Sequence, residues 1–297
     1  MDTLTFSQAL ALFESVYMPS RNLSSRTRVE YKTDVAQLIA FLDAQGLTGP
    51  QEVTLADLQA FLAHLDEQGL AGVTRRRKAA SLRAFFGFLH AAGYIAQNPT
   101  QGLTPPQIER KEPRFLTTQE YQALLRACSH QPRDAALIEL LLQTGMRLSE
   151  VARLRVDDIE LPGRITQDPA NTGSVLVHGK GRKQRTLPLN YKACRALKAW
   201  LAVRPQSESR ALFLTKFRQP MSTRAIQRVV EKYLQEAGIA NASVHTLRHS
   251  FATHHVAKGT SLKTVQEALG HADLKTTSIY VSTAKEAMKR DLQNNAL

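Results

Sequence analysis

The sequence predicts a mainly α-helical protein of two domains, the second of which carries a small antiparallel sheet. Three observations lead to this prediction. Apolar residues recur at helical spacing through the first hundred positions. A polar, proline-containing stretch without such spacing follows at residues 98–117. Around residues 173–189 the pattern changes to the alternation that is typical of strands. At 297 residues with 43% hydrophobic residues, the chain can build two ordinary cores.

Residues 1–105 are predicted to form a domain of four helices. Four segments place apolar residues on one helical face: SQALALFESVYM, SSRTRVEYKTDVAQLIAFLDAQG, TLADLQAFLAHLDEQG and GVTRRRKAASLRAFFGFLHAAG. Ser24 and Thr54 are residue types that cap helix N-termini. Glycines stand where three of the helices should end, at Gly46, Gly69 and Gly93.

Residues 106–115 are predicted to be a linker between the domains, and Pro105 and Pro106 stiffen the chain where it begins. The second domain, residues 116–297, begins with three helical segments, TTQEYQALLRACSH, PRDAALIELLLQTG and MRLSEVARLRVDDIE. Two alternating runs then flank a turn in GSVLVHGKGRKQRTLPL, which predicts a β-hairpin. Helical segments return from YKACRALKAWLAV onwards.

The charge of the chain indicates a polyanionic partner. The formal net charge is +13 and the sequence pI is about 10.0. Residues 1–105 are neutral, with nine basic and nine acidic residues, so residues 106–297 carry the whole excess. A field of this size attracts nucleic acid and speeds the encounter with it. The alternative is a basic protein that its charge keeps soluble.

Membrane and secreted classes are not expected. No run approaches the roughly 18 apolar residues that a membrane span needs, and the start MDTLTFSQAL lacks a basic-then-apolar signal segment. Cys128 and Cys194 form no motif with each other or with a nearby histidine, so we expect buried thiols in a reducing cytosol. We therefore expect a cytoplasmic protein with no membrane partner.

Two basic helices are candidates for DNA contact. The fourth helix of the first domain opens with a basic run: Arg75, Arg76, Arg77 and Lys78, followed by Arg83. Cations at a helix N-terminus oppose the helix dipole, so phosphate contact would explain them better than a solvated face does. The segment STRAIQRVVEKYLQEAG is the second candidate, through Arg224 and Arg228, with Lys232 on or near the same face. It is the weaker one, because this helix also needs a core face.

Further residues look out of place in a plain core. Arg147 follows a helix-ending glycine, and Glu150 lies three residues on, within reach of it. Lys180 stands between two glycines at the hairpin tip, with Arg182, Lys183 and Arg185 close behind. Arg182 and Lys183 are further candidates for DNA contact. Taken singly, each feature is also common on protein surfaces, as an exposed ion pair or a solubilising loop.

A histidine cluster lies in HTLRHSFATHH, where His245 and Arg248 share one helical face. His245 and His249 are four residues apart, as in a zinc pair, but Thr246 occupies the position where a metalloprotease has a glutamate. No cysteine or carboxylate falls at ligand spacing nearby. We therefore predict no metal site and no other cofactor.

Read in order, TGMRLSEV, GKGRKQRTLPL, HTLRHSFATH and LGHADLKTTSIY resemble the motifs of the tyrosine recombinases, the phage integrase family, and most closely its Xer-type bacterial members. The resemblance spans nearly the whole chain. It implies an N-terminal SAM-like core-binding domain and a C-terminal mixed α/β catalytic domain. It assigns catalytic roles to Arg147, Lys180, His245, Arg248, His271 and Tyr280, with Glu150 as a supporting acid. The segment ELPGRITQDPANTGSV is longer than in compact Xer proteins, which leaves the subfamily open.

The resemblance also implies a reaction. Tyr280 would cut a DNA strand and form a 3′-phosphotyrosine, and a 5′-hydroxyl from a partner duplex would complete the exchange. Arg147 and Arg248 would stabilise the extra negative charge of the transition state. Lys180 would protonate the leaving 5′-hydroxyl, while His245 and His271 hold the phosphate or move a proton. Neither a divalent metal nor ATP is expected.

The expected partner is double-stranded DNA with a specific recombination site, in the bacterial nucleoid, and both domains are expected to bind it. The segment TAKEAMKRDLQNNAL reads as an amphipathic helix, and the resemblance implies that it packs on a neighbouring protomer of a homo-tetramer on two DNA sites. Packing within its own subunit is the alternative. The polar residues before Tyr280 are interpreted as a flexible tether. A partner recombinase or an accessory protein is left open.

Three other functions are alternatives. A type IB-like topoisomerase would use the same chemistry without a partner duplex. A non-catalytic DNA-binding protein would lack at least one of the six catalytic positions, and a metal-dependent nuclease would need ligands that the sequence does not arrange. The sequence leaves the target site open, and with it the choice between chromosome-dimer resolution, transposon cointegrate resolution, and integration or excision.

Overall fold

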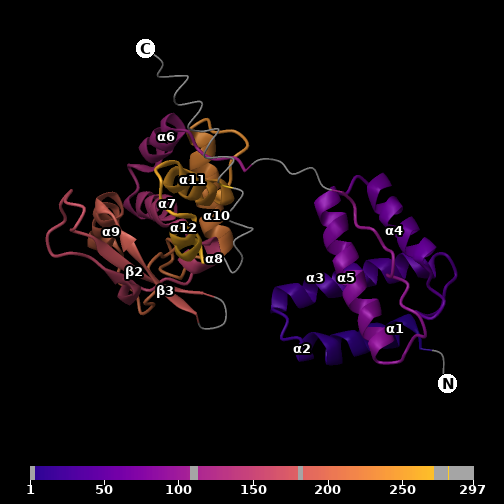
Figure 1. The fold of residues 1–297 in the computed structure, drawn as a ribbon. Helices are drawn as coiled ribbons and strands as arrows, with labels where there is room; N and C mark the ends of the chain where they lie inside the picture. Colours follow the sequence, from indigo (N-terminus) through magenta and orange to yellow (C-terminus); the bar gives the residue numbers. More distant parts are fainter. Residues whose placement is uncertain (1–3, 108–112, 180–182, 271–279, 281–297) are drawn as a thin grey trace, which may run out of the picture. The chain divides into compact units, whose positions relative to one another are not determined.

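The computed structural model describes residues 4–107, 113–179, 183–270 and 280. It divides into two compact units, Met1–Arg110 and Lys111–Leu297, each of which is built around its own apolar core. The predicted fold class is confirmed: the described elements are mostly helices, with one small antiparallel sheet in the second unit (Figure 1). No described helix is both long and apolar enough to span a membrane.

The described residues of the first unit form four helical segments. The first segment joins α1 (Phe6–Leu12), the π-helical turn η1 (Phe13–Tyr17) and α2 (Met18–Ser20), and it is followed by α3 (Ser25–Asp43), α4 (Leu55–Glu67) and α5 (Gly72–Ala91). The Ser24 and Thr54 side chains accept the backbone N–H groups of Thr27 and Asp57, as predicted for N-caps. The three expected terminating glycines all adopt positive φ: Gly46 at 84°, Gly69 at 75° and Gly93 at 77°.

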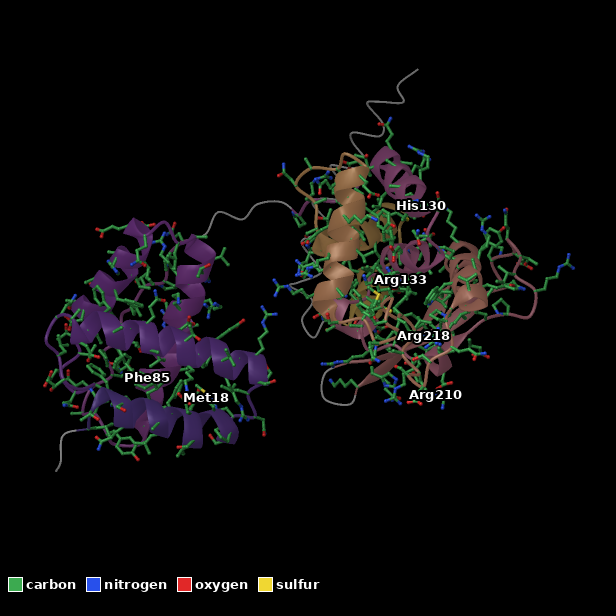
Figure 2. The ribbon with its side chains drawn as sticks, turned by 180° about the vertical axis from the view of Figure 1, so that it is seen from behind. Met18, Phe85, His130, Arg133, Arg210 and Arg218 are labelled. Carbon is green, nitrogen blue, oxygen red and sulfur yellow. The ribbon has the colours of Figure 1, made fainter. Side chains whose placement is uncertain are left out.

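Aromatic side chains fill the core of this unit. Phe13, Phe61, Phe85 and Phe86 are fully buried, as is Met18. The rings of Phe13 and Phe85 meet edge to face with centroids 5.3 Å apart. Figure 2 shows Met18 and Phe85 pointing into the space between the helices. The periodic apolar positions of the sequence therefore converge on one interior.

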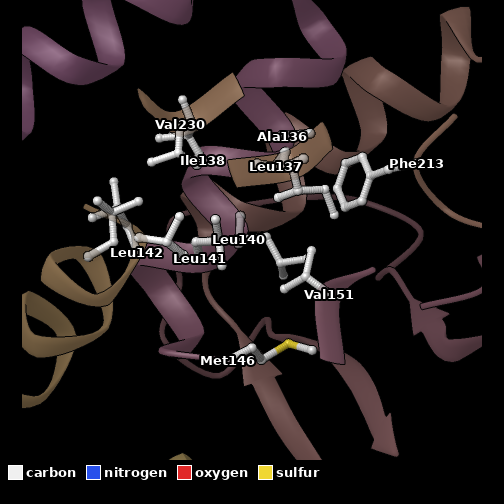
Figure 3. Packing of buried hydrophobic residues seen from close by; sticks show 14 of the residues in the cluster. Ala136, Leu137, Ile138, Leu140, Leu141, Leu142, Met146, Val151, Phe213 and Val230 are labelled. Atoms are coloured by element: carbon white, nitrogen blue, oxygen red, sulfur yellow. The ribbon is translucent and has the colours of Figure 1, made fainter. Parts of the chain in front are cut away.

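The second unit is arranged around one central helix. Its α-helices, within the part of the chain that the structure describes, are α6 (Thr118–Cys128), α7 (Pro132–Thr144), α8 (Leu148–Val151), α9 (Tyr191–Val203), α10 (Thr223–Glu236), α11 (Val244–Ala257) and α12 (Leu262–Leu269). Helix α7 packs against α6, α9 and α11, and its residues 136–142 are all buried. Figure 3 shows Leu137 and Leu140 of this helix close to Val151 of α8.

Three strands form the sheet of this unit, in the order β1 (Ile159–Glu160), β2 (Gly173–His178) and β3 (Gln184–Leu189), with antiparallel pairing throughout. The predicted hairpin is thus confirmed. In its register Val175 lies opposite Leu187 and Val177 lies opposite Arg185. Because side chains alternate across a strand, Arg185 points to the same face as Leu187 and Leu189, which are buried.

The expectation of one long helix over MRLSEVARLRVDDIE is wrong. Helix α8 has only four residues, and a short 3-10 turn, η2 (Val156–Asp158), and strand β1 follow it. The chain between them pairs with a distant segment: Val156 N donates to Arg210 O at 2.8 Å, and Leu212 N donates to Leu154 O at 2.8 Å. These long-range backbone bonds replace the local helical ones that the apolar spacing favours.

Candidate active site

A left-handed glycine places the first arginine of the site. Gly145 ends α7 with a φ of 60°, and a Cβ there would lie 2.5 Å from Phe251 Cδ1. Only glycine fits both the conformation and the space. Two residues later Arg147 takes the N-cap position of α8, where its backbone N–H donates to Glu150 Oε2 at 2.8 Å. The turn therefore fixes the start of the Arg147 side chain.

Three arginines from different elements meet at the C-terminal end of α12. Arg185 Nε donates to Ala268 O at 2.9 Å, Arg248 Nη2 donates to Leu269 O at 2.8 Å, and Arg147 Nη2 donates to Gly270 O at 2.8 Å. The last carbonyls of a helix lack partners within the helix and carry its negative dipole end, so they hold cations well. Three guanidinium groups are thereby gathered around one point.

Glu150 joins two of these arginines. It lies 3.2 Å from Arg147 Nη1 and forms a two-pronged pair with Arg185, at 2.9 Å and 3.0 Å. The residue is buried, with 6% of its surface exposed. Burial by itself would raise the pKa of Glu150, but hydrogen bonds from the Arg185 guanidinium and the Arg147 amide outweigh this effect and lower the pKa. Glu150 is therefore a buried carboxylate that fixes two arginines.

Among the described cations of the site, Arg248 is the most deeply buried. It is 8% exposed, and its Nη1 donates to the Gly145 carbonyl. Burial, with the charge of Arg147 as a second cause, lowers the pKa of Arg248 to about 10. The guanidinium still carries its charge at neutral pH. A guanidinium has five N–H donors, and the contacts to Gly145 and Leu269 use one donor on each terminal nitrogen.

Tyr280 lies in a small apolar cluster beside these cations. The side chain is 2% exposed and packs with Phe251, Ala252, Val265 and Leu269. Its Oη is 2.9 Å from His249 Nδ1. Burial raises the pKa of Tyr280, and the nearby charge of Arg248 opposes the rise. The tyrosine that the sequence singles out is therefore an interior residue and not a surface aromatic.

The six predicted catalytic residues fall into three sets: three that come together, one that is exposed, and two that lie outside the described residues. Arg147, Arg248 and Tyr280, with Glu150, come together although they lie far apart in the sequence. His245 is exposed at the start of α11, and its charge contributes to lowering the pKa of His249. Lys180 and His271 lie outside the described residues, as do Arg182, the proposed tether 271–279 and the tail 281–297.

Two residues of this centre were not singled out from the sequence. Arg185 stood in the basic run of the hairpin, but its alternation with Leu187 and Leu189 was a signal that it points inward. His249 was considered only as a metal ligand. No local pattern marks its contact with Tyr280, because the two residues are 31 positions apart. Among the described residues, no group of three or more histidines, cysteines or acids is placed to hold a metal.

The structure corrects one of the predicted DNA contacts. Lys78 is 5% exposed, and its Nζ donates to Asp34 Oδ1 at 2.8 Å and to Gln37 Oε1 at 2.7 Å. Arg77 also pairs with Asp34, which Ser81 binds too. Lys78 therefore neutralises a buried acid between α3 and α5, and it is not available as a phosphate ligand in this conformation.

The other candidates for DNA contact differ in whether their side chains already have partners within the protein. Arg75 pairs with Asp66 at 2.7 Å, and Arg83 donates to the carbonyl of Leu103, whereas Arg76 is exposed. In the second unit Lys183 is exposed beside the hairpin tip. Arg224 and Arg228 are exposed on α10, whose opposite face buries four apolar or aromatic side chains, Ile226, Val230, Tyr233 and Leu234.

The chain is similar in sequence to a known protein family. The model of the phage integrase family matches residues 114–287, more than half of the chain. The chain belongs to the phage integrase family. A second model of this family, its N-terminal SAM-like domain, matches residues 10–93. The family resemblance of the four motifs is thus confirmed.

Relatives of this phage integrase family member are bacterial recombinases. Tyrosine recombinase XerC of Bacillus subtilis (strain 168) is 34% identical over 290 residues, which cover 94% of this chain and 92% of the relative. Tyrosine recombinase XerC of Xylella fastidiosa (strain M23) is 36% identical over 264 residues, covering 88% and 87%. The chain is accordingly a tyrosine-type site-specific DNA recombinase, which acts through a tyrosine intermediate.

Solved structures agree on the fold. The XerH site-specific recombinase in a pre-cleavage complex with its difH substrate is 26% identical, with a TM-score of 0.70 over 95% of this chain and 84% of that one. A lambda integrase tetramer bound to a Holliday junction gives a TM-score of 0.73 at 19% identity, over 94% and 78%. The two-part architecture is therefore that of known family members.

Proposed function

We propose that Tyr280 is the nucleophile of the recombinase. Its Oη forms a bond to the phosphorus of the scissile phosphodiester, and the bond from phosphorus to the 5′ oxygen breaks. The products are a 3′-phosphotyrosine and a free 5′-hydroxyl. A 5′-hydroxyl from the partner duplex then attacks the phosphotyrosine, which rejoins the strands and releases Tyr280.

One observation carries this proposal: Arg147 and Arg248, 101 positions apart in the sequence, are held at the same helix end beside the cluster that contains Tyr280. Their N–H donors are fixed by carbonyl and carboxylate partners before any substrate binds. Preorganised donors of this kind are typically worth ~3–4 kcal/mol each toward a developing anion. A phosphorane-like transition state, with extra charge on its non-bridging oxygens, is the anion that two guanidinium groups suit.

The remaining roles in the proposal follow the motifs. Lys180 protonates the leaving 5′ oxygen, and His245 and His271 bind the phosphate or move the tyrosine proton. Glu150 acts through Arg147 and Arg185, which it positions. Because guanidinium groups neutralise the charge that a metal would otherwise meet, the reaction as proposed runs without a divalent cation or ATP.

The proposed substrate is double-stranded DNA carrying a specific site, in the cytoplasm of a bacterial cell. The exposed arginines Arg76, Arg224 and Arg228, and Lys183, are the proposed phosphate contacts. Complete exchange between two duplexes cuts four strands, and each protomer supplies one Tyr280. We therefore propose a homo-tetramer on two sites. A mixed tetramer, in which a second recombinase supplies half of the protomers, is the alternative, and a plasmid assay with and without cell extract distinguishes the two.

A nicked duplex tests the nucleophile. A site is first selected by binding from a random DNA library, and a nick next to the scissile phosphate then lets the cut fragment diffuse away. The wild-type protein should accumulate a covalent adduct on a denaturing gel, also in EDTA. Tyr280→Phe should abolish the adduct and keep the DNA affinity. Tyr94→Phe, at an exposed tyrosine, is the control and should behave as the wild type. An adduct of normal yield with Tyr280→Phe would contradict the assignment.

A plasmid assay separates the alternative, a type IB-like topoisomerase. A supercoiled plasmid with two selected sites should give recombinant circles, and chemical cross-linking of the protein on this DNA should trap four protomers. Relaxed plasmid without recombinants would support the topoisomerase. Recombinants that form only with cell extract would indicate a partner recombinase or an accessory protein.

A further inference from the structure

The Tyr280 hydroxyl occupies a position from which it cannot attack DNA. The side chain is 2% exposed and is covered by Phe251, Ala252, Val265 and Leu269. The phosphate of a duplex is bulky and charged, so it does not enter an apolar cluster of this kind. For Tyr280 to act as proposed above, its ring must leave this cluster. We call this buried position of Tyr280 the stored position.

His249 is the partner of the stored hydroxyl. It follows Arg248 on α11, is half-buried, and its Nδ1 lies 2.9 Å from Tyr280 Oη. The two rings are neighbours, with centroids 5.6 Å apart. A buried hydroxyl without a partner is unfavourable. The imidazole removes that penalty, and it thereby stabilises the stored position over a released one.

The protonation states of the pair fit a neutral hydrogen bond. Burial raises the pKa of Tyr280, so that its phenol keeps its proton. Burial, together with the charges of His245 and Arg248, lowers the pKa of His249, so that its imidazole is uncharged at neutral pH. An uncharged imidazole with its proton on Nε2 offers Nδ1 as an acceptor. The phenol O–H then donates to Nδ1.

We propose that His249 is a positioning residue of this recombinase: it accepts the Tyr280 hydroxyl in the DNA-free protein, stores the nucleophile in its protonated form, and raises the free energy needed to release it toward the phosphate. The proposal rests on Tyr280 being the nucleophile. It gives His249 a function that is separate from phosphate binding by its neighbour Arg248.

Three variants test this storage. His249→Phe keeps the size and removes the acceptor. His249→Asn puts an amide oxygen close to the place of Nδ1 and does not titrate, so it should restore the stored state. His255→Phe is the control, because His255 lies on the same helix against Phe251, and among the described residues no hydrogen bond or ring contact joins it to Tyr280. His249→Leu repeats the test if the phenylalanine variant does not fold by circular dichroism.

The first measurement is the acetylation rate of Tyr280 by N-acetylimidazole in the free full-length protein, read by peptide mass spectrometry. Tyr280 should be protected in the wild type, His249→Asn and His255→Phe. It should react about five-fold faster in His249→Phe, the factor that corresponds to a net hydrogen bond of about 1 kcal/mol. Equal protection in all four proteins would overturn the proposal.

The second measurement is the initial rate of adduct formation on the nicked duplex at saturating DNA. His249→Phe should form adduct several-fold faster than the wild type, and His249→Asn should match the wild type. Slower adduct formation in both variants would overturn storage and make His249 a group that assists attack. Acetylation needs no cleavage, so protected Tyr280 in a wild-type protein without any adduct would refute the proposed nucleophile and leave the storage contact standing.

Discussion

Arg185 shows how a single buried pair can organise a charged centre. Its guanidinium binds both oxygens of Glu150 and the carbonyl of Ala268. Glu150 in turn holds Arg147. A carboxylate in this position keeps three cations close together that would otherwise repel one another. Arg185 is therefore linked to Arg147 at the proposed phosphate site through Glu150.

Replacing Arg185 by alanine should weaken both stability and cleavage. Removing one partner of a buried ion pair typically costs about 3–5 kcal/mol, and Arg147 offsets part of this here. We expect a loss of about 3 kcal/mol in urea unfolding and about a ten-fold slower adduct formation, the factor that a shift of about 1.4 kcal/mol in transition-state binding gives. Unfolding is followed by the fluorescence of Trp200, the single tryptophan, which lies in the second unit.

Arg210→Ala is the matched control. Arg210 pairs with Asp157 at 2.5 Å in the same unit, but the two side chains are 71% and 50% exposed. Exposed pairs contribute about 0–1 kcal/mol, so this variant should stay close to the wild type in both measurements. Equal losses in Arg185→Ala and Arg210→Ala would contradict the role given to the Glu150 pair.

At the scale of elements, the end of α7 and the end of α12 build the site together. Gly145 at the first end and Gly270 at the second both have positive φ. A Cβ on Gly145 would touch Phe251 of α11 and Leu269 of α12, and one on Gly270 would lie 3.0 Å from Arg185 Nη1. The two glycines thus permit three helices and the arginines to approach closely.

Gly145→Ala should cost more than the backbone conformation alone explains. A left-handed conformation costs a non-glycine residue about 1–2 kcal/mol, and Gly238→Ala measures this, because Gly238 has a φ of 69° with open space around it. Overpacking typically adds about 1–3 kcal/mol at Gly145, where the Cβ would meet Phe251 and Leu269 at 2.5 Å and 2.8 Å. The difference between the two variants in Trp200-monitored unfolding checks this. Equal losses of stability in Gly145→Ala and Gly238→Ala would contradict this prediction, because Phe251 and Leu269 would then move aside without cost.

At the scale of the whole molecule, the two units have separate cores, and a polar cluster specifies the first one. Asp34 is 1% exposed and binds Arg77, Lys78 and Ser81. A buried carboxylate needs such partners, because its charge would otherwise be unfavourable away from water. The cluster joins α3 to α5, so it ties together helices that are more than forty positions apart.

Asp34→Ala should unfold the first unit at a lower urea concentration and leave the second unchanged. The substitution removes the carboxylate that pairs with the buried cation Lys78, and such a loss typically lowers the free energy of unfolding by about 3–5 kcal/mol. Circular dichroism, which reports helices of both units, should then show an early transition. Trp200 fluorescence, which reports the second unit, should keep its midpoint. The exposed pair of Glu14 and Lys32 supplies the control, Glu14→Ala. A shift of the Trp200 midpoint in Asp34→Ala would show that the units unfold together.

The sequence by itself determined the helices and the hairpin, the N-caps at Ser24 and Thr54, and the order of the four motifs that identify the family. These features depend on neighbours within a few positions, through apolar period, capping and turn chemistry. The same local signals failed over residues 152–160, where backbone pairing with residues 210–212 replaced helical bonds.

Only the tertiary structure decided which charges are buried and what they contact. Lys78 pairs with Asp34 across 44 positions, Arg185 with Glu150 across 35, and His249 with Tyr280 across 31. The sequence of a basic run does not show whether its side chains are exposed to water or paired with a buried acid, because burial depends on how distant elements pack. The fold thus turned one predicted DNA contact into a core ion pair, and it gave the tyrosine of the last motif a histidine partner.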